Sequence, residues 1–267
     1  MKYTETTCKT ALSKSLLPGL DYSLNPYTGC QHGCVYCYAP STIRYGGIEP
    51  WGAFVTAKTN IPVVLERELR RTKPGVVGIS TVTDPYQPVE SRLKLTRSCL
   101  EVLLAKAFPI CIQTKSALVA RDIDLIRDFP VKEAGLTITA LDDEISAIIE
   151  PGASLPGERL DALRLLSGNG VPTWAFVGPL VPGFIDKERL ADILARVKES
   201  GASRVLIDRL RLKPGLWPRM EKALTEEPEV LDACRRALFT DPDIFTDLRA
   251  HAAKVCQEIG LECELCY

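Results

Sequence analysis

The feature of this 267-residue sequence that most limits its fold is a regular alternation of two kinds of segment. Short apolar runs rich in β-branched residues alternate with longer stretches whose apolar residues recur at helical spacing. This alternation is typical of parallel strands joined by helical crossovers. The predicted strands are residues 22–26, 76–82, 109–114, 135–140, 172–177 and 204–208. The sequence therefore predicts an α/β fold built on a parallel sheet.

The helical stretches lie between these strands, and two more follow the last strand. The predicted crossover helices are residues 61–71, 92–106, 119–127, 157–168 and 187–200. Beyond residue 213, Pro214-Gly215 and Trp217-Pro218 are expected to break the chain, and helices follow at 229–239 and 243–259, with Gly260 as a C-cap. We expect residues 1–215 to form the α/β core and residues 216–267 a C-terminal helical extension packed on it.

Three cysteines follow the first predicted strand at short intervals: Cys30, Cys34 and Cys37. One loop can point three such thiolates at a single centre, where they would hold three irons of a cubane 4Fe–4S cluster and leave the fourth iron open. A structural zinc site or an electron-transfer ferredoxin normally has a fourth protein ligand. We expect His32, inside the loop, to hydrogen-bond near the cluster or face solvent. A zinc knuckle or three free thiols is the alternative.

The cysteine spacing, with Tyr36 directly before the third cysteine, resembles the signature of radical S-adenosylmethionine (SAM) enzymes. Further stretches resemble the spore photoproduct lyase-like group of that superfamily, often labelled DNA repair photolyases. They run in order along the chain: Asn25-Pro26-Tyr27, Tyr36-Cys37-Tyr38-Ala39-Pro40, Lys58-Thr59-Asn60, Thr83-Asp84-Pro85-Tyr86-Gln87-Pro88-Val89-Glu90, Thr114-Lys115-Ser116, Arg121-Asp122, Glu150-Pro151 and Pro179-Leu180-Val181-Pro182-Gly183. The resemblance implies a partial (β/α)6 barrel with reactive groups at the carboxyl ends of its strands.

The resemblance also implies a function. The open iron would chelate SAM, a ferredoxin or flavodoxin would supply an electron, and the 5′-deoxyadenosyl radical formed from SAM would abstract hydrogen from a substrate. A damaged nucleic acid is one substrate class that this implies, and a protein, a peptide or a small metabolite is another. A non-catalytic iron–sulfur or zinc protein, acting as electron carrier or scaffold, is the rival from a different class.

Polar residues at the predicted strand ends are candidate ligands for SAM. Thr83, Asp84 and Glu90 could hydrogen-bond its amino group or ribose, since a carboxylate suits an ammonium partner. Asp84-Pro85 could equally be turn chemistry. Tyr36 is expected to present its ring beside the cluster and the adenine, which is compatible with core packing.

Lys115 ends an apolar strand, where a long cation at the barrel mouth can pair with the SAM carboxylate. Ser116 supplies a nearby hydroxyl. If Lys115 faces the lumen, strand alternation turns Gln113 and Cys111 the same way. Cys111 is then a candidate hydrogen-atom donor to a substrate radical, or else a small apolar filler of the lower barrel.

Two later motifs are less specific. By resemblance, Glu150-Pro151 and Arg159 frame SAM or the substrate, although an ordinary helix start at Pro156 fits equally well. Pro179 opens the stretch 179–183, which resembles the fifth-strand backbone contact to adenine.

The remaining cysteines divide into two groups. Cys99 and Cys234 lie on apolar helical stripes and are expected in the core, whereas Cys8 is isolated. The tail carries Cys256, Cys263 and Cys266. These could form a second metal site or a pair of redox thiols, or stand in a late edge strand as incidental cysteines, which we favour.

Composition limits the partners. A net charge of −1 gives no global basic field for nucleic acid, although several cations gather near the last predicted strand: Arg204, Arg209, Arg211, Lys213 and Arg219. No apolar stretch has the length of a membrane span, and no N-terminal signal segment is evident. We therefore expect a cytoplasmic protein, in which ten cysteines stay largely reduced and no membrane is a partner.

Overall fold

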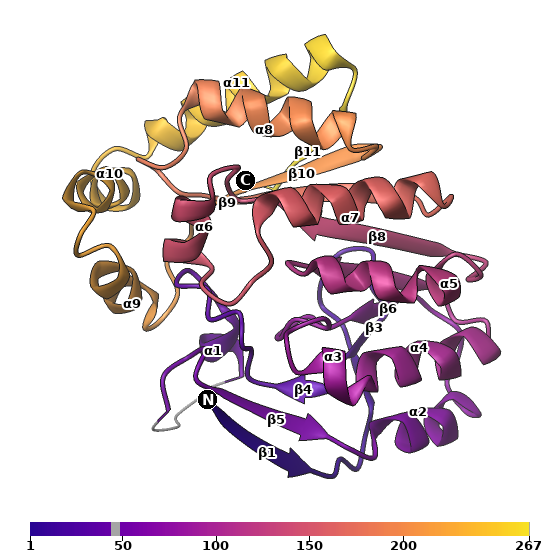
Figure 1. The fold of residues 1–267 in the computed structure, drawn as a ribbon. Helices are drawn as coiled ribbons and strands as arrows, with labels where there is room; N and C mark the ends of the chain where they lie inside the picture. Colours follow the sequence, from indigo (N-terminus) through magenta and orange to yellow (C-terminus); the bar gives the residue numbers. More distant parts are fainter. Residues whose placement is uncertain (44–48, 267) are drawn as a thin grey trace.

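A curved eight-stranded sheet organises the computed structural model, which describes residues 1–43 and 49–266 (Figure 1). The strand order is β11-β10-β9-β8-β7-β6-β3-β2, and every pairing is parallel except that of β2 with β3. The strands are β2 Leu12–Lys14, β3 Tyr22–Leu24, β6 Val77–Ile79, β7 Ile110–Thr114, β8 Lys132–Thr137, β9 Thr173–Leu180, β10 Arg204–Arg209 and β11 Glu262–Leu265. The predicted α/β class is confirmed, and the six predicted strands are β3, β6, β7, β8, β9 and β10.

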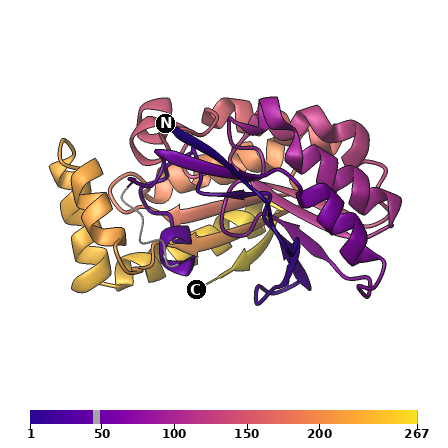
Figure 2. The ribbon, with the colours of Figure 1, turned by 90° about the horizontal axis from the view of Figure 1, so that it is seen from below.

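The helices of the described ranges are α1 Ala39–Thr42, α2 Ile61–Leu69, α3 Glu90–Leu93, α4 Leu95–Ala105, a 3-10 helix Ala117–Asp122, α5 Ile123–Ile126, α6 Asp143–Ile149, α7 Pro156–Gly168, α8 Lys187–Glu199, α9 Leu216–Ala223, α10 Pro228–Phe239 and α11 Asp243–Ile259. The crossover helices α2, α4, α5 and α7 lie along one side of this sheet, whereas α9 and α10 stand beyond one end of its strands (Figure 2). None of the helices among the described residues has the length and apolar content that a membrane span requires.

A second, three-stranded sheet is formed by residues on both sides of the cysteine loop in sequence. It pairs β1 Lys2–Thr6 in parallel with β5 Phe54–Lys58, and β5 antiparallel with β4 Tyr27–Thr28. Sequence patterning did not indicate these strands. Because β4 leads directly into the cysteine loop, this small sheet fixes where the loop begins.

Several predicted boundaries were wrong. The helix expected at 92–106 is split into α3 and α4 by Lys94, which has a left-handed backbone at φ 52°. The helix expected at 119–127 is a 3-10 helix followed by the short α5. Pro218 does not break the chain but lies in the first turn of α9, where a missing backbone N–H is tolerated.

The C-terminal residues extend the sheet. The strand β11 pairs in parallel with β10, and Gly260 caps α11 with a left-handed backbone, as predicted. The alternative of a late edge strand is therefore the one observed. In Figure 1, α11 runs alongside α8, so the last helix covers the same side of the sheet as the crossover helices.

Candidate functional site

The cysteine loop leaves β4 through a turn that only glycine allows. Gly29 has φ +83°, and a Cβ on it would stand 2.6 Å from the Phe54 carbonyl oxygen in β5. Cys30 and Cys34 are buried, and Cys37 is partly exposed. The loop therefore starts pressed against the small sheet, with its sulfurs turned inward.

The stretch 83–90 after β6 holds this loop in place. The Gln31 N–H donates to Gln87 Oε1 at 2.9 Å, and the Val89 N–H donates to Gln31 Oε1 at 2.6 Å. Thr83 Oγ1 donates to the Gly29 carbonyl at 2.6 Å and accepts a bond from Gln87 Nε2 at 3.0 Å. Thr83, a predicted SAM ligand, thus has both hydroxyl functions engaged by the protein.

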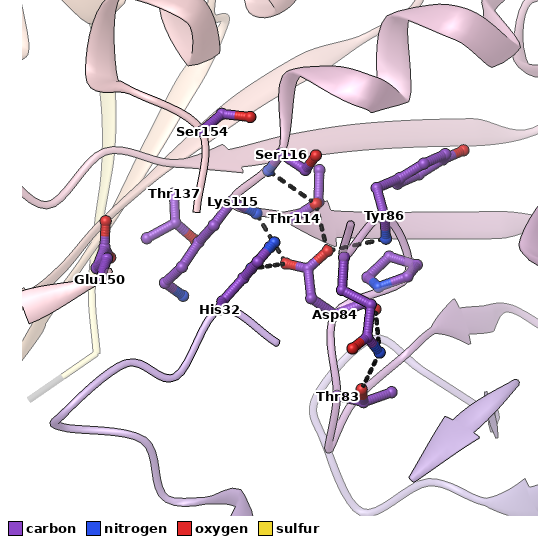
Figure 3. A network of polar contacts seen from close by, with 12 residues as sticks. His32, Thr83, Asp84, Tyr86, Thr114, Lys115, Ser116, Thr137, Glu150 and Ser154 are labelled. Carbon is purple, nitrogen blue, oxygen red and sulfur yellow. Dashed lines mark hydrogen bonds and ion pairs between the residues drawn. The ribbon is translucent and has the colours of Figure 1, made fainter. Parts of the chain in front are cut away.

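Asp84 is the centre of a buried polar network (Figure 3). Its Oδ1 accepts from the Tyr86 N–H at 2.9 Å and from Thr114 Oγ1 at 2.6 Å, and its Oδ2 accepts from the Lys115 N–H at 2.9 Å. Burial alone would raise the pKa of Asp84, but His32 and these hydrogen bonds outweigh it and lower the pKa to about 2. Asp84 therefore ties the carboxyl ends of β6 and β7 to the cysteine loop.

His32 lies against this carboxylate. Its Nδ1 is 3.3 Å from Asp84 Oδ2, and the imidazole is 2% exposed. The contact has the distance of an ion pair but not the angles of a hydrogen bond, so Nδ1 has no hydrogen-bond partner. His32 thus faces the Asp84 carboxylate and not solvent, which was one of the two expected positions.

Lys115 faces the cysteine loop from the end of β7. Along β7, Cys111 and Gln113 share the less buried face with Lys115, as strand alternation predicted. Lys115 Nζ lies 5.7 Å from the centroid of the Tyr36 ring. Burial alone would lower the pKa of Lys115, but the negative charges of the Glu150 and Asp84 carboxylates, and of Cys34 when it is ionised, outweigh it and raise the pKa. A charged ammonium group is therefore kept beside the loop.

Beneath Tyr36 lies a buried ion pair. The Tyr36 hydroxyl donates to Glu150, which also accepts from Thr139 Oγ1 at 2.7 Å and lies 2.5 Å from Arg159 Nη1. Arg159 donates in addition to the Ser154 carbonyl at 2.7 Å. Glu150 and Arg159 therefore support the Tyr36 ring from below, with side chains that are 1% exposed.

Other predicted ligands are engaged by the fold. Ser116 Oγ caps the 3-10 helix by accepting from the Leu118 N–H at 3.3 Å. Glu90 accepts hydrogen bonds from Tyr27 and Thr96 and pairs with Arg121 at 2.8 Å, so it is tied into the packing of α3 and α4.

The fifth-strand motif begins inside β9, whose last two residues are Pro179 and Leu180, and continues beyond it. Pro179 is partly exposed and follows a cis peptide bond. Gly183, at φ +90°, would bring a Cβ to 2.8 Å from Val230 Cα, so its close approach is to α10.

Cys111 lies near the amino end of β7, opposite Glu133 of β8. Lys115 is four residues away, about 13 Å along the strand. Burial and then the Glu133 carboxylate raise the pKa of Cys111 to about 11, so the thiol keeps its hydrogen at neutral pH. Glu133 pairs with Arg204 at 2.7 Å, and the Arg204 guanidinium lies over the Trp174 ring. The hydrogen-donor role of Cys111 stays a prediction.

The three loop cysteines fit a cluster. Burial raises the pKa of each thiol, to about 12 for Cys30, while backbone N–H groups of His32 and Asp84 at Cys30, and of Ala39 at Cys37, act in the opposite direction. Such N–H donors aimed at sulfur stabilise thiolates.

Among the described residues, no three thiol, imidazole or carboxylate groups lie close enough to hold one metal ion. A 4Fe–4S cluster offers a separate iron to each thiolate, so its three ligands need not meet at a single ion.

The remaining cysteines lie elsewhere. Cys99 and Cys234 are in the core, as predicted. The backbone of Cys8 is held by the Asn60 side chain. Cys256 of α11 and Cys263 of β11 lie within hydrogen-bond reach of each other, and this contact, followed by burial, raises the pKa of Cys256.

Two residues beside the cysteine loop were not found from the sequence. Arg219 of α9 donates from Nη2 to the Cys37 carbonyl at 2.5 Å. Trp51, which precedes β5, lies with its indole N–H near the Cys37 sulfur. Neither contact has a local sequence signal, because Arg219 reaches the loop across 182 residues of chain.

Comparisons with known proteins agree with this geometry. A family model of the radical SAM superfamily matches residues 24–208. An uncharacterized protein of Methanocaldococcus jannaschii is 37% identical over 180 residues, which cover 67% of this chain and 68% of that protein. A radical SAM Nalpha-GlyT isomerase of Pseudomonas phage M6 is 26% identical over 238 residues, which cover 87% of this chain and 47% of that protein.

Solved structures share the fold. A spore photoproduct lyase mutant with bound AdoMet and dinucleoside spore photoproduct matches 99% of this chain and 82% of its own, with a TM-score of 0.71 and 16% identity. Streptococcus suis SuiB bound to precursor peptide SuiA matches 91% of this chain and 48% of its own, with a TM-score of 0.61 and 14% identity. The family match over most of the chain identifies it as a member of the radical SAM superfamily, whose enzymes use a 4Fe–4S cluster and SAM for radical chemistry.

Proposed function

We propose that Cys30, Cys34 and Cys37 each ligate one iron of a 4Fe–4S cluster and leave the fourth iron for SAM. The observation that carries this proposal is the convergence of the three loop thiols beside Lys115 at the carboxyl ends of the parallel strands. When bound, the cluster and SAM supply a 5′-deoxyadenosyl radical that removes a hydrogen atom from the substrate. The chain itself binds, orients and encloses these groups.

The residues around the loop have separate roles in this proposal. Lys115 binds the SAM carboxylate, since its Nζ is charged and donates no hydrogen bond to a described residue. Tyr36 packs beside the cluster, and Pro179 contributes backbone close to the adenine. Thr83, Asp84 and Ser116 shape the site from behind, because their polar atoms already bond to the loop and the strand ends.

The test is anaerobic reconstitution with iron and sulfide, followed by incubation with SAM and dithionite. We expect about four irons per chain and formation of 5′-deoxyadenosine and methionine. The triple variant Cys30→Ala/Cys34→Ala/Cys37→Ala loses both, whereas Cys8→Ala, outside the loop, retains both. Adventitious iron only in the wild-type protein, or no 5′-deoxyadenosine, would refute the proposal.

For the substrate we propose a nucleic acid, with a ferredoxin or flavodoxin as reductant. The likeness to a spore photoproduct lyase mutant with bound dinucleoside spore photoproduct, over 99% of this chain, supports this class. Arg211 and Lys213 are exposed just beyond β10 and can contact phosphates. The net charge of −1 restricts the contact to such a local strip.

Salt dependence tests this substrate class. Fluorescence anisotropy of a labelled DNA duplex between 50 and 200 mM salt should give a log–log slope of about −2 to −3, since each neutralised phosphate contributes about −0.9. Arg211→Gln/Lys213→Gln should remove about two units of that slope. Absence of DNA binding at the lowest salt contradicts a nucleic-acid substrate.

A peptide substrate is the second candidate, because SuiB bound to its precursor peptide shares the fold. The rival of a non-catalytic iron–sulfur carrier predicts that SAM leaves the EPR signal of the reduced cluster unchanged. The proposed function predicts a changed signal, so this one spectrum separates an enzyme from a carrier.

A further inference from the structure

Cys37 differs from the other two loop cysteines in its neighbours. Cys30 and Cys34 are buried by elements of the sheet end, whereas Cys37 is partly exposed. Two side chains from outside the barrel strands lie against it, Trp51 before β5 and Arg219 of α9. One corner of the loop is thus closed by residues that the strand-end motifs do not include.

Arg219 reaches this corner from the C-terminal part of the chain. Its Nη2 donates to the Cys37 carbonyl at 2.5 Å. The helix α9 that carries it is anchored by the buried Leu216 and Met220 on either side of Arg219 in sequence. Burial lowers the pKa of Arg219 and the neighbouring Cys37 thiol opposes this, but an arginine stays protonated at any physiological pH. A fixed positive charge therefore stands beside Cys37.

Trp51 approaches from the opposite end of the chain. Its ring makes an edge-to-face contact with Phe54, with ring centroids 5.9 Å apart, which holds the indole in one orientation. The indole N–H lies near the Cys37 sulfur without completing a hydrogen bond to it.

Both side chains carry a buried N–H group without an acceptor. Trp51 Nε1 and Arg219 Nε have no hydrogen-bond partner among the described residues. A buried donor left unpaired lowers the free energy of unfolding by about 1–3 kcal/mol. Two such donors beside Cys37 therefore indicate that an acceptor binds there. A cysteine thiolate in a cluster, together with the cluster sulfides, supplies acceptors there.

We propose that Trp51 and Arg219 form a donor pair at Cys37 that raises the reduction potential of the cluster. This inference rests on the proposed ligation by the loop cysteines. N–H donors and a positive charge favour the state that carries one more electron, because they interact more strongly with the greater negative charge. The C-terminal extension thereby takes part in the electron transfer that starts the reaction, although it lies outside the residues of the family match.

The test measures the midpoint potential of the reconstituted cluster by EPR-monitored titration, without substrate. In Arg219→Gln, the ratio of reduced to oxidised cluster at a fixed potential should fall about tenfold, which is about 59 mV for a one-electron couple. Trp51→Phe should lower it about threefold, a smaller change because no charge is removed. Arg219→Lys keeps the charge and should recover part of the loss.

The matched control is Lys222→Gln, which removes an exposed positive charge from the same helix. We expect its potential to stay within twofold of the wild-type ratio. If Arg219→Gln and Trp51→Phe also stay within that range, the inference is overturned and the two residues serve packing only. Wild-type protein that assembles no cluster refutes the proposed function, whereas an assembled cluster with an unchanged potential in the variants refutes this inference alone.

Discussion

At the scale of single residues, Lys115 is the group whose role follows most directly from its surroundings. Its ammonium stands over Tyr36, faces the loop thiols, and is held in the charged state by the anionic groups around it. A charged donor that is largely desolvated and has no hydrogen-bond acceptor among the described residues is prepared for a ligand carboxylate.

Replacing Lys115 by Met should therefore weaken SAM binding by about 30-fold, or about 2 kcal/mol for a charged hydrogen bond. Calorimetric titration of the anaerobically reconstituted protein with SAM measures this change. Lys132→Met is the control, because Lys132 donates to carbonyls of the loop before β8 and lies at the other end of the sheet. Equal SAM affinity in Lys115→Met and wild-type protein would exclude Lys115 as the carboxylate ligand.

Glu150 should matter for stability rather than for chemistry. Glu150→Gln leaves Arg159 buried without its counter-ion and should lower the free energy of unfolding by about 3 kcal/mol. Urea unfolding of the cluster-free protein measures this loss. The double variant Glu150→Gln/Arg159→Met should recover part of it, and a stability of Glu150→Gln equal to the wild type would contradict a structural role.

The same pair gives a pH dependence with a defined sign. Burial alone would raise the pKa of Glu150, but Arg159 and Lys115 lower it below the ordinary value of 4.5. The stabilisation from ionised Glu150 is thus fully present above the ordinary, unfolded-state pKa of 4.5. It is lost as the pH falls through the lower folded-state pKa. Between about pH 5 and pH 3, wild-type stability should decline more steeply than that of the double variant.

How far these residues could be predicted depends on how local their signals are. The cysteine spacing and the lysine at the end of an apolar strand are local patterns, and both led to the site. Asp84 is a predicted SAM ligand, but its carboxylate accepts the backbone N–H groups of Tyr86 and Lys115, which no sequence pattern reveals. Trp51 and Arg219 contact Cys37 only through tertiary folding, so no local sequence pattern indicates either contact.

At the scale of elements, the turn after α6 is the counterpart of the 83–90 stretch. The Val35 N–H donates to the Ile149 carbonyl at 3.0 Å, and the Gly152 N–H donates to the His32 carbonyl at 2.9 Å. The cysteine loop is thus held by backbone bonds on one side and by Gln31, Gln87 and Thr83 on the other. A loop gripped from two sides keeps its sulfurs in position before any cluster binds.

Gly152 is the residue of this turn at which a side chain would most disturb the cysteine loop. A Cβ there would stand 2.1 Å from the Gln31 carbonyl oxygen, so Gly152→Ala must push the turn away from the loop. We expect iron content after reconstitution to fall at least threefold, measured by a colorimetric iron assay. Gly157→Ala in the first turn of α7 is the control, since its Cβ would meet nothing within 4 Å and alanine favours the helix. Full iron loading of Gly152→Ala would show that the turn does not position the loop.

Elements were predictable where their own sequence decides them. The strands β7, β9 and β10 are apolar runs within a residue or three of their predicted bounds. The strands β1 and β5 have half-polar sequences, and their pairing of Lys2 with Phe54 joins distant parts of the chain, so no local pattern announces them. Lys94 broke a continuous amphipathic pattern because the chain turns there through a left-handed conformation that lysine rarely adopts.

At the scale of the whole molecule, the C-terminal residues pack against the last strand and helix of the parallel sheet. We propose that residues 1–215 form the partial barrel and residues 216–267 an extension packed on it. Among the contacts between the two parts, β11 pairs with β10, α11 packs on α8, and Arg219 donates to the Cys37 carbonyl. The buried Cys256 and Leu261 belong to the main core.

These contacts predict that the extension unfolds together with the barrel. A backbone bond from the Cys266 N–H to the Ile207 carbonyl, 2.9 Å long, completes the β10–β11 pairing at its far end. Native-state hydrogen exchange of the full chain should therefore give the amides of β11 and of the buried face of α11 the same opening free energy as those of β10. Exchange through an opening several kcal/mol easier than that of β10, with α2 at the other end of the sheet as reference, would instead make the extension a separate folding unit. Its arginine could then leave the cluster loop while the barrel stays folded, and the potential would respond to conditions that loosen α9 alone.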